Sequence, residues 1–147
     1  MSYSSWVFEG VYVLRWGLRP QLSDVPAYAA EIAAARQRQG KPLVAVFIMP
    51  RESAAPDETF RKCQARHLPH IFTSLECAVC VFEGSGFVAS LKRSALATIL
   101  MLSPNRHPIY VRSTLEDALV RDPPQRYSFD ARSVLAEVTQ RMADAAA

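Results

Sequence analysis

The feature that most constrains the fold of this chain is the alternation of short apolar runs with longer segments of helical periodicity. Nearly continuous apolar runs cover residues 43–49 and 77–82, and such runs are typical of strands buried on both faces. Helical patterns cover residues 23–39, 57–75 and 87–102. Because a helix between successive strands implies a right-handed parallel crossover, the pattern predicts an α/β fold with a mixed, mostly parallel sheet.

The chain opens with a predicted β-hairpin. Residues 6–8 and 11–16 are rich in aromatic and branched side chains, and they flank the pair Glu9-Gly10. A two-residue turn containing glycine is the usual connection between antiparallel strands. Both faces of the second strand are apolar, so we expect helices or a partner to cover them.

Shorter elements follow the third helical pattern, which we expect to end at Pro104 and Asn105. Residues 108–112 predict a short strand. Residues 113–116 match a capping box, which predicts a fourth short helix.

A final amphipathic pattern covers residues 130–143, after a loop that contains two adjacent prolines. We therefore predict an α/β domain at residues 1–122 and a C-terminal helical extension at residues 123–147, packed on the same domain. Pro69 lies inside the second helical pattern and predicts a kink or a break there.

Composition restricts the class of protein. The 147 residues are half apolar and about one fifth charged, with a net charge of +3, and the basic residues are scattered among acids. This does not indicate a nucleic-acid partner. No segment approaches the ~20 apolar residues that cross a bilayer, the first residues lack a signal-peptide pattern, and three cysteines do not suggest disulfides. We expect a cytoplasmic protein without membrane insertion.

The element order, with the hairpin first, resembles the STAS-like domain of sulfate transporters and anti-sigma-factor antagonists. The resemblance covers about residues 3–121, and the closest similarity is to divergent, free-standing bacterial members. It implies a regulatory or signalling module and a phosphorylated Ser or Thr in the loop after the third strand. Here that loop spans residues 49–57. Its candidate is Ser53, although the family's Asp-Ser-Ser/Thr-Gly motif is absent.

Two cysteine patterns suggest chemistry but have simpler interpretations. Cys77 and Cys80 match C-x-x-C, yet positions three apart in a strand point to opposite faces, so we predict two buried thiols. Cys63 and His67 share one face of a helix. They are an activated nucleophile, half of a metal site, or a packed cysteine beside a partly exposed histidine. We favour packing, and predict no catalytic residue, metal or cofactor.

Residues 84–89 fit the pattern G-x-G-x-x-A between a strand and a helix. The motif occurs late in the chain, and no acidic residue ends the following strand, which argues against a dinucleotide. Two interpretations remain. Gly84, Ser85 and Gly86 form a tight structural turn, or their N–H groups bind an anion with help from Lys92 and Arg93.

The aromatic residues of the hairpin are either core or interface. Interfaces are enriched in aromatic side chains, and twofold dimers commonly bury such surfaces. We therefore expect a homodimer whose candidate interface comprises Trp6, Tyr12, Trp16, Val134 and Val138.

Three functional hypotheses follow. The leading one is a non-catalytic STAS-like regulatory module in bacterial signalling. Its partner is another protein or a second copy of the same chain. The alternative is a small-ligand sensor or carrier that takes an anion at the glycine turn or a lipid-like molecule in an apolar cavity. The third is an enzyme that uses Cys63 and His67.

Overall fold

The computed structural model describes residues 2–103 and 107–146, so Pro104 and Asn105 lie outside the described residues. Along the chain the elements are β1 (Tyr3–Phe8), β2 (Val11–Trp16), α1 (Asp24–Gln39), β3 (Leu43–Met49), α2 (Glu58–Phe72), β4 (Leu75–Phe82), α3 (Gly86–Leu102), β5 (Ile109–Arg112), the π-helical turn η1 (Asp117–Arg121) and α4 (Ala131–Ala146).

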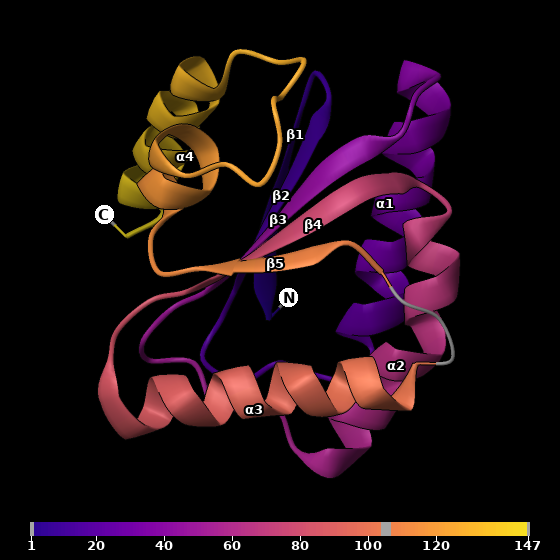
Figure 1. The fold of residues 1–147 in the computed structure, drawn as a ribbon, viewed down its shortest axis with the longest axis vertical. Coiled ribbons are helices and arrows are strands. Elements are labelled where there is room, and N and C mark those ends of the chain that lie inside the picture. The colour runs from indigo at the N-terminus through magenta and orange to yellow at the C-terminus, as the bar shows by residue number, and fades with distance from the viewer. Residues whose placement is uncertain (1, 104–106, 147) are drawn as a thin grey trace.

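One five-stranded sheet runs through the middle of the molecule (Figure 1). Its strands lie in chain order, β1-β2-β3-β4-β5. β1 pairs antiparallel with β2, and the remaining neighbours are parallel. The fold is therefore α/β, with an N-terminal hairpin and a mostly parallel mixed sheet, which confirms the predicted fold class.

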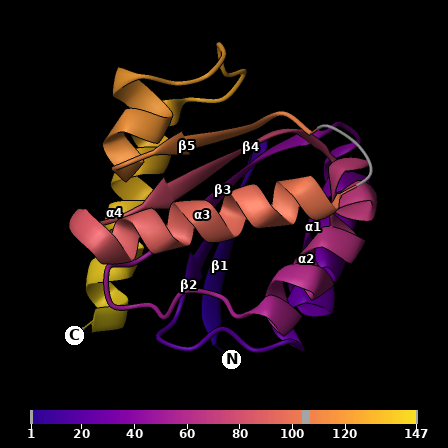
Figure 2. The ribbon, with the colours of Figure 1, turned by 60° about the horizontal axis from the view of Figure 1, so that its bottom comes forward.

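Helices cover both faces of this sheet. α1, α2 and α3 lie on one face, because right-handed crossovers between strands in sequential order all return on the same side. α4 and η1 lie on the other face (Figures 1 and 2). Tyr12 and Trp16 of β2 point toward the α1–α2 side, whereas Val11 and Val13 point toward α4. Both apolar faces of the hairpin are thus covered by helices of the same chain.

The hairpin turn requires glycine. Gly10 has a φ of +80°, a conformation that L side chains rarely adopt. A β-carbon at this position would also lie 3.3 Å from Cδ1 of Phe129, which approaches from the segment before α4. The turn is therefore shaped both by its own backbone and by the layer that covers it.

α2 is one continuous helix from Glu58 to Phe72, so the predicted break at Pro69 is wrong. The proline lies near the C-terminal end of the helix. Only the backbone hydrogen bond from its own position is lost there, and few residues follow that a bend would have to redirect.

Polar side chains accept backbone hydrogen bonds near two predicted helix starts. Ser23 makes no side-chain cap, and Asp24 instead accepts a hydrogen bond from the Gln21 N–H at 2.8 Å. In the predicted capping box, Thr114 accepts from the Asp117 N–H at 3.0 Å, and only the single turn η1 follows.

Among the described residues, no helix combines the length and the apolar character that crossing a membrane requires.

Candidate functional site

α3 is the helix whose packing leaves the most apolar surface uncovered. Its inner face places Ala89, Ala95 and Ile99 toward the sheet. On its outer face Phe87 is 78% exposed and Met101 is 85% exposed. Leu91 and Leu102 lie exposed on the same side, since the 3.6-residue period groups these four positions within about a third of the helix circumference.

The surroundings of this outer face are basic. α3 contains no acidic residue, and its Arg93 is exposed. A shallow groove separates the end of α3 from α2, and its lining includes Lys62, Arg66 and Leu102. We call this surface, with the four exposed apolar side chains of α3, the α3 outer face. It offers apolar contact area beside positive charge.

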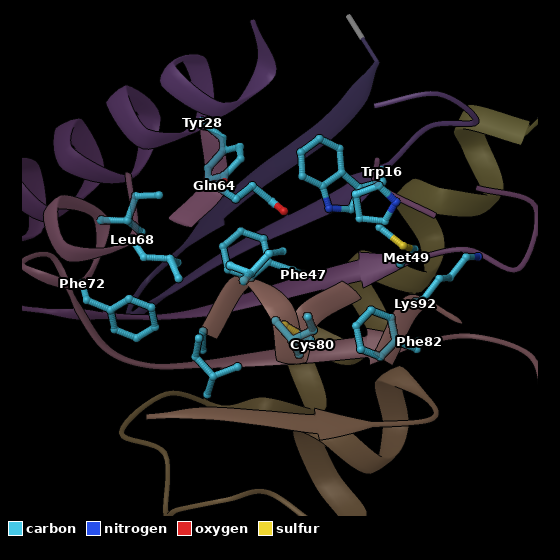
Figure 3. A pocket seen from close by; sticks show the side chains of 16 residues that line it. Trp16, Tyr28, Phe47, Met49, Gln64, Leu68, Phe72, Cys80, Phe82 and Lys92 are labelled. Carbon is cyan, nitrogen blue, oxygen red and sulfur yellow. The ribbon is translucent and has the colours of Figure 1, made fainter. Parts of the chain in front are cut away.

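A partly open, almost wholly apolar cavity of about 80 Å³ lies under the inner face of α3. The sheet forms its floor with Phe47, Ala78 and Cys80, and the helices cover it with Leu68 and Leu96 (Figure 3). From α3 the cavity is bordered by Lys92, Leu96 and Ile99, whose side chains leave the layer above the sheet incompletely filled.

The polar groups on the cavity wall are neutral. Burial raises the pKa of Tyr28 well above its ordinary value, and the adjacent Gln64 amide opposes this effect. Burial also raises the pKa of the Cys80 thiol to about 12. In Figure 3 the Gln64 amide points into the space between Tyr28 and Trp16. The cavity therefore offers a phenol, an amide and a thiol, all uncharged near neutral pH.

Lys92 was predicted to face an anion at the glycine turn, and the structure places it elsewhere. The residue is only 1% exposed, and its stem lines the cavity. Its Nζ donates to the carbonyl oxygens of Pro50 at 2.7 Å and Arg51 at 3.1 Å. Burial lowers its pKa, and the charges of Glu52 and Glu83 oppose that shift. Lys92 fastens α3 to the loop after β3.

The glycine turn itself is adjacent to a different cation. Gly84 has a φ of +94°, and a β-carbon there would lie 3.1 Å from the Arg51 Nε. Ser85 caps α3 with extended backbone and no side-chain hydrogen bond. Arg93 points toward Ser113, with Nη2 at 3.5 Å from the hydroxyl oxygen. The structure thus separates Lys92 and Arg93 from the turn and places Arg51 beside it.

Ser53, the candidate for phosphorylation, is 2% exposed. Its hydroxyl donates to the Gly17 carbonyl oxygen at 2.6 Å. The side chain fixes the loop after β3 to the end of the hairpin, so in this conformation the hydroxyl is not presented to a kinase. The observed role of the Ser53 side chain is therefore to hold that loop.

The cysteine patterns have the geometry expected of packing. Cys77 faces the α4 side of the sheet and Cys80 the opposite side, and burial raises the pKa of the Cys77 thiol to about 11. The Cys63 Sγ lies 3.9 Å from the His67 Nδ1, which is itself 2.8 Å from the Cys63 carbonyl oxygen. When that nitrogen donates to the carbonyl it cannot also accept a proton from the thiol.

Four of the five candidate interface residues belong to the core of this chain. Tyr12 and Trp16 are buried under α1 and α2, and Val134 and Val138 are buried between α4 and the sheet. Trp6 is partly buried against the α4 layer. This correction has a simple cause: α1 and α2 cover one face of the hairpin, and α4, rather than a second molecule, covers the other.

The sequence did not predict a group of hydrogen bonds around the Glu31 carboxylate. Glu31 of α1 accepts hydrogen bonds from three hydroxyl groups of the hairpin: Tyr3 at 2.6 Å, Ser5 at 2.6 Å and Tyr12 at 2.7 Å. Burial raises the pKa of this carboxyl, but the three hydrogen bonds outweigh that effect and hold it below the ordinary value. The signal in the sequence is weak, because the partners lie 19 to 28 residues away.

No protein-family model matches the chain, and no curated protein matches it. Within residues 2–103 and 107–146, no group of three or more His, Cys, Asp or Glu side chains is arranged to hold a metal ion.

Proposed function

We propose that this chain is a non-catalytic interaction module that binds a protein partner through the α3 outer face. The observation that carries the proposal is the exposure of Phe87 and Met101 at opposite ends of one helix, at 78% and 85%. Large apolar side chains gathered in the exposed surface of a soluble protein mark interaction sites. A regulatory role in the bacterial cytoplasm, as in STAS-like domains, is part of this proposal, and the observed element order supports it.

The charge around this surface specifies the partner's chemistry. With no acid on α3 and with Arg66 and Arg93 exposed, the complementary segment is apolar with acidic residues at its edges. Electrostatic complementarity of this kind favours specificity and rapid association. Phe87 has the large, rigid side chain that dominates binding energy at interface centres.

The test compares two double variants in the purified chain. Phe87→Ser with Met101→Ser removes the apolar anchors, whereas Leu18→Ser with Leu22→Ser removes exposed leucines from the loop before α1. Proteins captured from the host by the parent chain are identified, purified and titrated against all three forms by calorimetry. We expect the α3 variant to weaken binding at least tenfold and the loop variant to leave it within twofold.

Charge reversal sharpens this test. Arg66→Glu with Arg93→Glu is expected to slow association, and the effect should shrink at high salt because screening weakens surface charges. A partner whose affinity is the same for the parent and the Phe87/Met101 variant would overturn the proposal. Light scattering that gives twice the mass of 16.4 kDa, lost in the α3 variant, would identify a second copy as the partner.

A further inference from the structure

The cavity beneath α3 has features of a binding site in its own right, distinct from the α3 outer face. It lies between the sheet and the helices on the side to which all three crossovers return. Its lining is apolar except for a few groups near Gln64 and Tyr28. An apolar chamber with few polar groups is the usual form of a small-molecule site.

The cavity disfavours charged ligands. Lys92 contributes its hydrocarbon stem, and in Figure 3 its ammonium nitrogen points away from Phe47, toward the end of β3, where the carbonyl oxygens of Pro50 and Arg51 accept its hydrogen bonds. The remaining polar groups of the wall are uncharged. A charged ligand would therefore lose much of its hydration without gaining a counter-charge, which is unfavourable.

The volume limits the size of the occupant. The cavity of about 80 Å³ is roughly half of the ~150 Å³ apolar cavity that admits benzene in another protein. It therefore suits a molecule of about five heavy atoms, part of which extends through the open side of the cavity. Leu96 of α3 borders this space, so its side chain sets how much room remains.

We propose that this cavity binds a small neutral molecule with a short, branched or compact hydrocarbon body and one hydroxyl or carbonyl group. The polar group pairs with the Gln64 amide and the Tyr28 hydroxyl, and the hydrocarbon lies between Phe47 and Leu96. This inference does not depend on the function proposed for the α3 outer face.

The two tryptophans of the chain provide the readout. Trp16 lines the cavity, whereas Trp6 packs on the opposite face of the sheet. In two-dimensional ¹H–¹⁵N NMR spectra each indole N–H gives its own signal. Titration with isobutanol is expected to shift the Trp16 indole signal to a plateau and to leave the Trp6 signal in place. Isobutyrate, with the same carbon skeleton and a negative charge, is expected to shift neither.

Matched variants locate the site. Leu96→Phe fills the cavity and is expected to weaken isobutanol binding at least tenfold, whereas Leu91→Phe adds the same volume on the exposed side and leaves binding within twofold. Gln64→Leu is expected to weaken isobutanol about tenfold, as loss of one hydrogen bond implies. It should leave the binding of xenon, which has no polar group, unchanged.

Three results would overturn the proposal: no plateau in the Trp16 shift, equal binding by the Leu96→Phe variant, or preference for isobutyrate. If Leu96→Phe fails to give a dispersed spectrum, Ala78→Val fills the same cavity from the sheet and replaces it. The variant Phe87→Ser with Met101→Ser is expected to bind isobutanol like the parent, so failure of this site and failure of the proposed function are distinguishable.

Discussion

α1 and α3 cover the same face of the sheet but are attached to it in different ways. α1 buries Val25, Tyr28 and Ile32, and it is fastened to the hairpin at two places. Glu31 accepts the three hydroxyl hydrogen bonds, and Gln39 both accepts from the Gly10 N–H at 2.7 Å and donates to the Phe8 carbonyl oxygen at 3.0 Å.

α3 has far fewer attachments of this kind. Its inner face borders a cavity, and Lys92 and Arg93, both in its N-terminal half, supply its side-chain hydrogen bonds to distant parts of the chain. Its largest apolar side chains point outward. α1 therefore contributes more buried contacts and hydrogen bonds to the fold than α3, and binding surfaces are commonly found on less firmly held elements such as α3.

Truncating one buried isoleucine in each helix is expected to give the largest difference in stability between α1 and α3. Ile32→Ala in α1 is expected to lower the free energy of unfolding by about 4 kcal/mol, because the side chain is fully enclosed. Ile99→Ala in α3 is expected to cost about 2 kcal/mol, since Ile99 already borders empty space and loses fewer contacts. Both residues are buried. Equal losses in urea denaturation would show that α3 is packed as firmly as α1.

Removal of the Glu31 carboxylate tests the attachment of α1. Glu31→Ala is expected to destabilise the chain by about 3 kcal/mol, because three hydroxyl groups lose their acceptor. The control Glu9→Ala removes an exposed carboxylate from a surface ion pair with Lys41, and its effect is expected to stay within about 0.5 kcal/mol. If Glu31→Ala lowers the free energy of unfolding no more than Glu9→Ala does, then Glu31 does not attach α1 more firmly than α3 is attached.

The ionisation of Glu31 also predicts how the free energy of unfolding changes with pH. Its pKa in the folded chain lies below the ordinary value of 4.5, so its contribution is fully present above that value and is lost as the pH falls through the folded pKa. The fall in unfolding free energy of the parent below about pH 4.5 is therefore expected to be shallower in Glu31→Gln. Parallel curves for the two proteins would contradict the hydrogen-bonded, ionised carboxylate.

Hydrogen exchange compares the local stability of α1 and α3 without any mutation. Amide protons in the second half of α3 are expected to exchange at least about tenfold faster than those at the centre of α1, because local opening there breaks fewer buried contacts. Mass spectrometry of peptides from the two helices resolves them. Equal protection would mean that α3 opens only when the whole domain unfolds.

The sequence predicts those elements whose determinants are local. The apolar run at residues 43–49 coincides with β3, and the Glu9-Gly10 turn forms as expected. The arrangement around α3 is different, because it depends on residues distant in the chain. Lys92 looks like a surface charge in its helical pattern, and only the approach of carbonyl oxygens 41 and 42 residues away explains its burial.

The α3 outer face is expected to have the smallest effect on stability. Phe87→Ser with Met101→Ser should change the free energy of unfolding by less than about 0.5 kcal/mol, since neither side chain loses buried contacts. Thermal and urea denaturation check this. A marked loss of stability would mean that these side chains belong to the packing of the domain, and would make α3 more like α1.

The position of α4 in the chain has a consequence for biosynthesis. Five strands and three helices are complete before residues 131–146 are made, yet these residues cover Val11 and Val13 on the second face of the sheet. At about 5–20 residues per second, the nascent chain therefore spends on the order of a second or more with that face open. We expect chaperones to bind the exposed face during this interval, until residues 131–146 cover it.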